Sequence, residues 1–328
     1  MKKHIYIYSP SGAVRDKAAF KRGVARLHAL GHDVELDSAV LTSYQRFSGD
    51  DDTRLAAIHR AASSKADVAL ISRGGYGLTR ILPGIHYKKV AKAIEQGMLF
   101  VGISDFTAFQ SAVLAKTGAI TWAGPALCEG FGVGCKPGLA AGLDNATANA
   151  PDEIMEACFD DVIRGQGEGT GWRQHREASP NAVDSRAAGH GGTFTIHDAK
   201  LWGGNLTVLT SLLGTPYFPD IKGGILFLED VAEHPYRIER MLTQLLYAGV
   251  LKRQKAIVLG QFTEFKLVPH DRGFKLQTVI EWLQQHIKIP VLTNLPYGHV
   301  ATKVLLPVGA SVDLAIENRD AMLFWGHV

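Results

Sequence analysis

The sequence predicts an α/β protein whose first half is a doubly wound parallel sheet and whose second half is a mixed α+β domain. Two observations predict this organisation. In the first half, short β-rich runs alternate with helical patterns, which is typical of a parallel sheet covered by helices on both faces. In the second half the strands become closely spaced toward the end. At 328 residues the chain has room for two domains of roughly 150 residues each.

The predicted elements of the first half follow one another as strand, helix, strand. In the first helix, Phe20, Val24 and Leu27 fall on one face. Gly118 ends the helix that precedes the last strand of this half. The predicted strands are HIYIY, HDVELD, DVALIS, MLFVGIS and AITWAGP, and the predicted helices cover residues 15–30, 53–63, 87–95 and 105–116.

A stretch rich in glycine and small polar residues, 165–192, is the best candidate for a linker. It divides the chain into a domain at 1–165, a linker at 166–190 and a domain at 191–328. The second domain is predicted to contain strands at TFTIHD, GILFLED and AIVLGQF, helices after Asn205, at YRIERMLTQLLYAG and at 276–286, and several β runs near the end.

Composition argues against several classes of partner. The net charge is only +3 and 20% of the residues are charged, so a dense basic surface for nucleic acid is not expected. No run approaches the roughly 20 apolar residues of a membrane span. The amino-terminal apolar run is too short for the core of a signal peptide, so a cytoplasmic location is expected. Three irregularly spaced cysteines, Cys128, Cys135 and Cys158, predict free thiols.

Two loops follow neighbouring strands and should open at the same edge of the sheet, where ligands bind in such folds. One is RGGYG, residues 73–77, whose glycines can turn backbone N–H groups toward an anion or simply make a tight turn. The other contains Ser104 and Asp105. Ser104 suits the cap of a helix, and it also suits a nucleophile that gains from N–H groups at a helix start. Phe106 disfavours the G-x-S-x-G elbow.

A nucleophilic serine needs a base and an acid that orients the base. Glu229 and Asp230 end an apolar strand, and either could supply the acid. His299 lies after a proline and a glycine, in a turn that could aim it at a substrate. Among the 13 histidines, His234 is the main competitor for the role of base.

Several stretches together resemble the LD-carboxypeptidases, the muramoyl-tetrapeptide carboxypeptidase family of serine peptidases. They are SPSG at 9–12, RGGYG at 73–77, GISD at 102–105, GGNLTVLTSLLGTPY at 203–217, FLEDVAEHPYRIERMLTQL at 227–245 and YGH at 297–299. The resemblance implies a Ser-Glu-His triad at Ser104, Glu229 and His299, with a flavodoxin-like first domain, a homodimer and no metal or cofactor. Ile103, where an aromatic residue is common, and the long linker depart from the family pattern.

The resemblance implies that a terminal D-alanine is removed from cytoplasmic murein tetrapeptides during peptidoglycan recycling. The N–H groups of Gly75 and Asp105 are candidates for an oxyanion hole. Arg73, Tyr76 and Arg237 are candidates for binding the substrate, whose carboxylate needs a cationic or N–H-rich receptor. Two alternatives stay open: a microcin-immunity-type peptidase that cleaves an aminoacyl-nucleotide antibiotic, and a non-enzymatic module that binds a small molecule.

Overall fold

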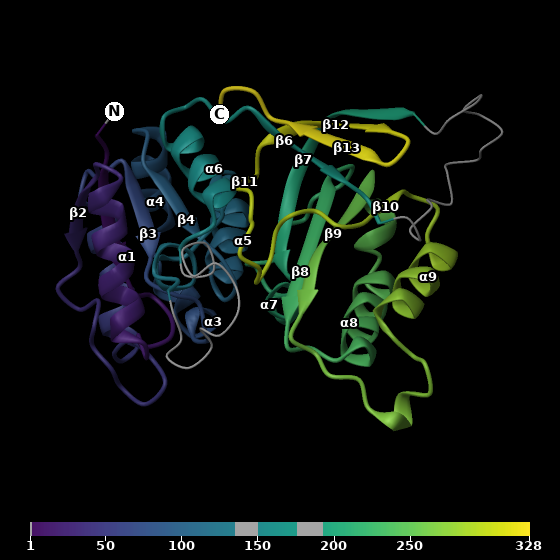
Figure 1. Cartoon of the computed structure of the whole chain (residues 1–328), viewed down its shortest axis with the longest axis horizontal. Coiled ribbons are helices and arrows are strands. Elements are labelled where there is room, and N and C mark those ends of the chain that lie inside the picture. Colours follow the sequence, from purple (N-terminus) through teal and green to yellow (C-terminus); the bar gives the residue numbers. More distant parts are fainter. Residues whose placement is uncertain (1, 135–149, 176–192) are drawn as a thin grey trace.

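The computed structural model describes residues 2–134, 150–175 and 193–328 and contains two sheets that lie side by side (Figure 1). The first sheet has six strands in the order β11-β5-β4-β3-β1-β2, and the second has seven in the order β10-β9-β8-β7-β12-β13-β6. The predicted fold class is confirmed, because a parallel sheet forms the first half and a second, mixed sheet dominates the other.

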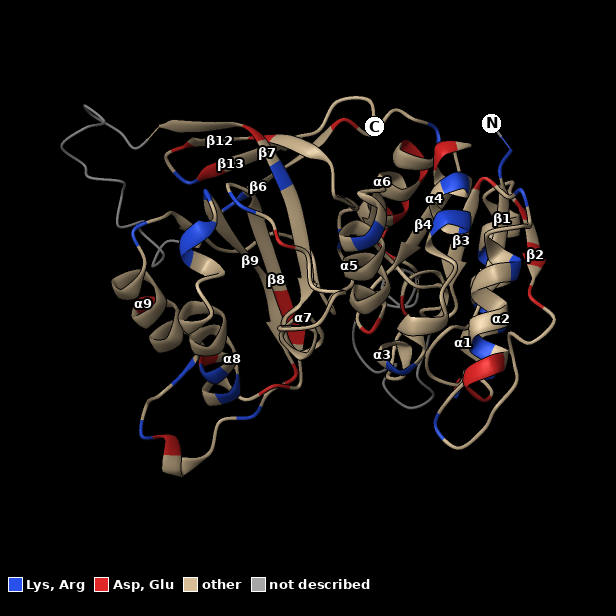
Figure 2. Ribbon diagram, turned by 180° about the vertical axis from the view of Figure 1, so that it is seen from behind, with Lys and Arg blue, Asp and Glu red and all other residues tan. Residues whose placement is uncertain are grey.

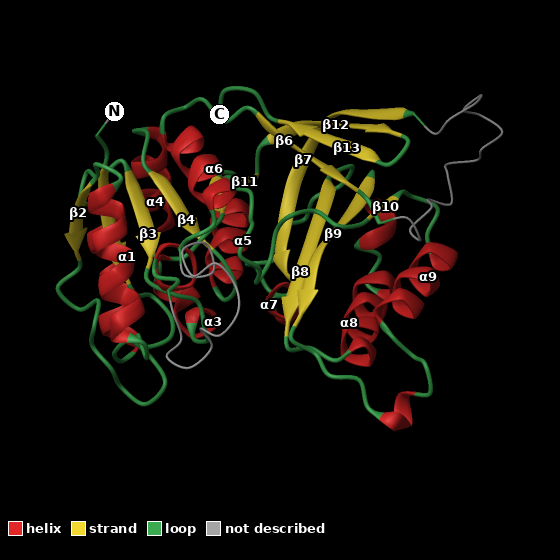
Figure 3. Ribbon diagram, in the orientation of Figure 1, coloured by secondary structure: helices red, strands yellow, loops and turns green. Residues whose placement is uncertain are grey.

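In the first sheet, β1 to β5 are parallel and follow the flavodoxin-like order, with β1 between β2 and β3. The residues of β1, β3, β4 and β5 are almost all buried, as expected for strands covered on both faces, whereas the edge strand β2 is largely exposed. Helices lie on both sides of the sheet (Figure 3). The strands are β1 (His4–Tyr8), β2 (Asp33–Leu36), β3 (Val68–Ile71), β4 (Leu99–Gly102) and β5 (Thr121–Ala123), and the helices are α1 (Lys17–Ala29), α2 (Asp51–Ala61), α3 (Leu78–Ile81), α4 (Tyr87–Glu95), α5 (Phe106–Thr117) and α6 (Glu153–Ile163).

The second sheet is parallel on one side and antiparallel on the other. Strands β7 to β10 are parallel, whereas β12, β13 and β6 extend the sheet in antiparallel pairs. The elements are β6 (Gly169–Arg173), β7 (Phe194–Asn205), α7 (Leu206–Ser211), β8 (Ile225–Val231), α8 (Pro235–Tyr247), β9 (Ala256–Thr263), α9 (Leu276–His286), β10 (Val291–Leu292), β11 (Leu306–Val308), β12 (Ser311–Glu317) and β13 (Asp320–Phe324).

One strand of the second half belongs to the sheet of the first half. Strand β11, late in the chain, pairs antiparallel with β5 and completes the first sheet. Its Pro307 lies on an edge strand, where a missing N–H is tolerated. In the stretch predicted as a linker, residues 169–173 form β6 and pair with β13, while 176–192 lie outside the described residues.

Three further expectations concern the distribution of surface charge, the possibility of a membrane-spanning helix and the state of the cysteines. In the view of Figure 2, basic and acidic residues are interspersed over both halves of the protein. Within the described residues, no helix is long and apolar enough to cross a membrane. Cys128 and Cys158 are free thiols, as predicted, and Cys135 lies outside the described residues.

Candidate active site

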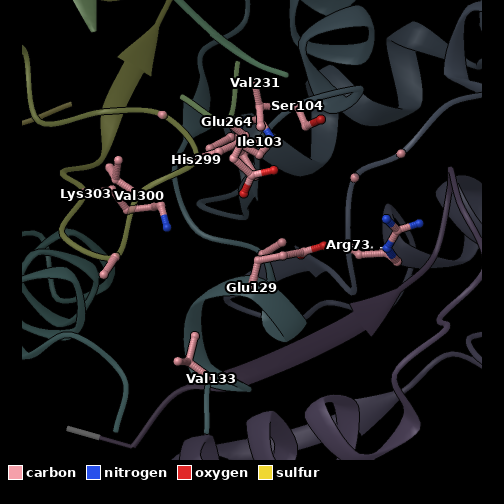
Figure 4. Close-up of a pocket in the computed structure, with 15 residues that line it drawn as sticks. Arg73, Ile103, Ser104, Glu129, Val133, Val231, Glu264, His299, Val300 and Lys303 are labelled. Carbon is pink, nitrogen blue, oxygen red and sulfur yellow. Dashed lines mark ion pairs between the residues drawn. The ribbon is translucent and has the colours of Figure 1, made fainter. Parts of the chain in front are cut away.

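A cavity of about 530 Å³ opens where loops of the two halves meet (Figure 4). The first half contributes the segments after β3, β4 and β5, and the second half contributes the ends of β8 and β9 and the loop between β10 and β11. The residues that line it include Arg73, Gly74, Gly75, Ile103, Ser104, Glu129, Val231, Glu264, His299 and Lys303. Several residues predicted from separate parts of the sequence therefore face one space.

Ser104 has a backbone conformation that the sequence did not reveal. Its φ angle is +66°, in the left-handed region that costs an L-residue roughly 1–2 kcal/mol. Helix α5 begins at Phe106, with Asp105 at the N-cap and no side-chain cap hydrogen bond. The interpretation of Ser104 as a helix cap is therefore wrong, and its side chain lines the cavity instead (Figure 4).

The carboxylate of Asp105 holds this strained turn in place. Asp105 is 2% exposed, and its Oδ2 accepts hydrogen bonds from the Ser11 hydroxyl and, at 2.9 Å, from the Leu78 N–H. Burial raises the pKa of Asp105, whereas these two hydrogen bonds favour its charged form. The side chain next to the serine thus ties the β4–α5 turn to two other loops.

Gly74 lies directly against Ser104. A Cβ atom at position 74 would be 2.7 Å from Ser104 Cβ and 2.9 Å from Ser104 Oγ. Contacts this short force one of the two residues to move, so only glycine lets the loop after β3 approach the serine.

We expect Gly74→Ala to lower turnover by on the order of a hundredfold, because a displacement of about 1 Å in a reacting group has an effect of that size. The measurement is kcat/KM together with the thermal unfolding midpoint. Gly171→Ala is the matched control, since the nearest atom to a Cβ there is 3.7 Å away. Equal activity of Gly74→Ala and the control would contradict this account of the loop.

The two backbone N–H groups predicted for an oxyanion hole follow two neighbouring strands, β3 and β4. Gly75 lines the cavity with a φ angle of +118°, and Asp105 precedes the first turn of α5. Within the described residues, neither N–H donates a hydrogen bond to another backbone carbonyl. An N–H at the start of a helix is also favoured by the helix dipole when negative charge develops nearby.

His299, which lines the cavity, forms a close pair with Glu229. Nδ1 of His299 is 2.8 Å from Oε2 of Glu229, which is fully buried in β8. Burial lowers the pKa of His299, but the hydrogen bond and negative charge of Glu229 outweigh burial, so the pKa is raised. With Nδ1 bonded to the carboxylate, the other ring nitrogen is left to exchange a proton.

Asn205 holds the carboxylate of Glu229 in position. Its Nδ2 group donates to Glu229 Oε1 at 3.2 Å and to Asp230 Oδ1 at 2.9 Å. Its Oδ1 accepts from the Val208 N–H at 3.1 Å and caps α7. Asp230 is also held by both the hydroxyl and the N–H of Thr207, so Glu229 rather than Asp230 is left to bond the histidine.

Asn205→Ala should lower the free energy of unfolding by about 2–4 kcal/mol, because it removes the cap of α7 and takes away the hydrogen-bond donor of the buried Glu229 Oε1. Chemical denaturation of the purified protein measures this change. The control is Asp50→Ala, which removes an exposed cap of α2 that accepts the Thr53 N–H, and a smaller loss is expected there. A loss at Asn205 no larger than at Asp50 would refute the supporting role.

Ser104 and His299 line the same cavity (Figure 4). The side chain of His299 is hydrogen-bonded to Glu229 and not to Ser104. Catalytic hydrogen bonds often tighten only when substrate binds. Of the candidates for substrate binding, Arg73 lines the cavity, whereas Tyr76 and Arg237 do not.

The residues outside the cavity have other contacts. Tyr76 lies 6.0 Å from Phe47 between ring centroids, and Arg237 pairs with Glu233 at 3.5 Å. His234, the competing base, caps α8 and lies 3.1 Å from Asp271.

Three charged residues of the cavity, Glu129, Glu264 and Lys303, were not predicted from the sequence. None of them belongs to a recognisable motif. Within residues 2–134, 150–175 and 193–328, no group of three or more His, Cys, Asp or Glu side chains could hold a metal ion.

Comparison with known proteins places this architecture among known peptidases. The model of the LD-carboxypeptidase N-terminal domain matches residues 5–124, and that of the LD-carboxypeptidase C-terminal domain matches residues 198–314. The crystal structure of muramoyltetrapeptide carboxypeptidase from Oxalobacter formigenes superposes with a TM-score of 0.78 at 36% identity, covering 98% of this chain and 97% of that one.

Two curated relatives match at lower identity. The murein tetrapeptide carboxypeptidase of Pseudomonas aeruginosa is 29% identical over 94% of this chain and 92% of its own length. The microcin C7 self-immunity protein of Escherichia coli is 26% identical over 95% of this chain and 90% of its own length.

The fold and these matches together define a serine-type carboxypeptidase. The chain belongs to the LD-carboxypeptidase family. The resemblance inferred from the motifs is thereby confirmed, and the alternative of a non-enzymatic binding module is set aside.

Proposed function

We propose that this protein is a serine LD-carboxypeptidase that removes the terminal D-alanine from cytoplasmic murein tetrapeptides in peptidoglycan recycling, and that it acts as a homodimer. The observation that supports the proposal is the shared cavity, which Gly75, Ser104 and His299 line together, with His299 hydrogen-bonded to the buried Glu229. The murein peptides named for the relatives from Pseudomonas and Oxalobacter support the substrate class.

In the proposed mechanism, Ser104 Oγ attacks the carbonyl carbon before the terminal residue while His299 takes the hydroxyl proton. Negative charge develops on the carbonyl oxygen, where the two N–H groups can stabilise it. His299 then gives the proton to the leaving amine, and water releases the acyl group from the serine. Glu229 keeps His299 in the reactive tautomer and stabilises its cation.

The similarity to the microcin C7 self-immunity protein supports a second candidate, cleavage of an aminoacyl-nucleotide antibiotic by the same serine. The two candidates are separated by offering purified protein a muramyl tetrapeptide and an acyl-sulfamoyl adenosine. D-alanine release from the tetrapeptide, with little cleavage of the adenosine compound, is the expected result. No D-alanine release would refute the murein function, and selective cleavage of the adenosine compound would favour the second candidate.

A further inference from the structure

Lys303 is a buried cation at the wall of the cavity. It lies four residues after His299, in the loop that leads to β11, and it is only 3% exposed. Its side chain lines the cavity on the side of His299 and Val300 (Figure 4). The preceding Thr302 hydroxyl donates to Asp152 Oδ2 at 2.6 Å, which anchors this loop to the start of α6.

Arg73, a second cationic side chain of the cavity, already has partners in the protein. Its Nε is 3.5 Å from Glu129 Oε1, and its Nη1 donates to the Ala13 carbonyl at 3.4 Å. Lys303, by contrast, has neither a hydrogen bond nor an ion pair with any group in the described part of the chain. The ammonium group of Lys303 is therefore available to a ligand, whereas the guanidinium group of Arg73 already has partners in the protein.

An unpaired ammonium in a buried site is energetically costly. Burial lowers the pKa of Lys303, and the carboxylates of Glu129, Asp152 and Glu229 only partly counter this effect. A ligand carboxylate placed beside the ammonium would supply the missing partner, since a lysine head group binds anions as a compact point charge. Peptides cleaved by a carboxypeptidase necessarily present a free terminal carboxylate, and murein peptides also contain internal ones.

We propose that Lys303 binds a carboxylate of the peptide substrate within this cavity, an inference that rests on the proposed function. Lys303 is then a residue for substrate recognition, whereas Arg73 mainly holds Glu129. The role requires no proton transfer by Lys303.

The test measures binding without turnover, in the Ser104→Ala background, by isothermal titration calorimetry. Three peptides are compared: the muramyl tetrapeptide, the same peptide with its terminal carboxyl amidated, and the same peptide with its internal carboxyls amidated. Adding Lys303→Met should weaken binding of the unmodified peptide by roughly thirtyfold to a thousandfold, the range for loss of one partner of a buried charge pair.

If the carboxyl that contacts Lys303 is amidated, proteins with and without Lys303→Met should bind that peptide equally well. Whether this happens with the terminally or the internally amidated peptide shows which carboxylate Lys303 binds. Lys303→Arg should retain most of the binding. Lys288→Met, which removes an exposed lysine outside the cavity, is the matched control and should have no effect.

The inference is overturned if Lys303→Met leaves binding unchanged, or if it weakens all three peptides equally. Thermal unfolding of each variant shows whether it has folded. Failure of the wild-type protein to release D-alanine would instead refute the proposed function, so the two failures can be told apart.

Discussion

Replacing Ser104 with alanine should reduce D-alanine release by on the order of 10⁴-fold or more, because loss of the nucleophile from such a triad has an effect of that size. The fold should be retained, since the Ser104 hydroxyl caps no helix and its side chain faces the cavity. The measurement is kcat under saturating tetrapeptide, with the thermal unfolding midpoint determined on the same preparation.

Two further variants make this prediction sharper. Ser104→Gly should be as inactive as Ser104→Ala. Its free energy of unfolding should exceed that of the wild type by about 1 kcal/mol, because glycine adopts a φ angle of +66° without the strain of serine. Ser211→Ala, at an exposed serine outside the cavity, should retain full activity. A loss of less than about a hundredfold in Ser104→Ala would argue against a nucleophilic role.

Glu229→Gln should lower the maximal kcat/KM by about 10³- to 10⁴-fold, as expected when the residue that fixes the tautomer of a catalytic histidine is replaced by an amide. The substitution should also change how kcat/KM depends on pH. His299 must be neutral to accept the serine proton, and in the wild type its pKa is raised above the ordinary value of about 6.5. Activity should therefore fall as the pH decreases through this raised pKa.

In Glu229→Gln the carboxylate is gone and burial of His299 dominates, so the pKa of His299 should fall. The acidic limb of kcat/KM against pH should consequently move to lower pH. Asp271→Asn is the matched control, because Asp271 contacts His234 outside the cavity and its loss should leave the limb in place. An unchanged acidic limb in Glu229→Gln would contradict the pairing of Glu229 with the titrating base.

Local signals in the sequence predicted most of the elements closely. The helices expected at 87–95 and 276–286 have these bounds in the structure. The helix expected at 53–63 begins earlier, at Asp51, because Asp50 caps it through the Thr53 N–H. Helix α6 was not predicted, although Asp152 before its apolar pattern is a recognisable cap. Capping and periodicity are short-range effects, so the sequence reveals them.

Sequence patterns did not predict the features that depend on contacts between distant segments of the chain. Strand β6 has a glycine-rich sequence typical of a turn, and only its pairing with β13 makes it a strand. The left-handed turn at Ser104 depends on the hydrogen bonds of Asp105 with two other loops. Lys303 reaches the cavity only because its loop leads to β11, which completes the sheet of the first half. These contacts form between segments that local patterns do not relate.

The candidate site was predicted in outline because motifs mark its main residues, while their arrangement had to come from the structure. Strand ends and a rigid turn made Ser104, Glu229 and His299 candidates among others, and the resemblance to the LD-carboxypeptidases implied that these three form the triad. The roles of Gly74 and Asn205 follow only from distances to side chains far along the chain. The catalytic roles of the triad residues and the supporting roles of Gly74 and Asn205 are predictions that the variants above test.

The most direct test of the central claim, that Ser104 is the nucleophile, is to treat the protein with a serine-directed fluorophosphonate and locate the adduct by peptide mass spectrometry. The account predicts a single adduct on Ser104, slowed by the tetrapeptide and strongly reduced in His299→Ala. An absent adduct, or one on another serine with Ser104 unmodified, would contradict it.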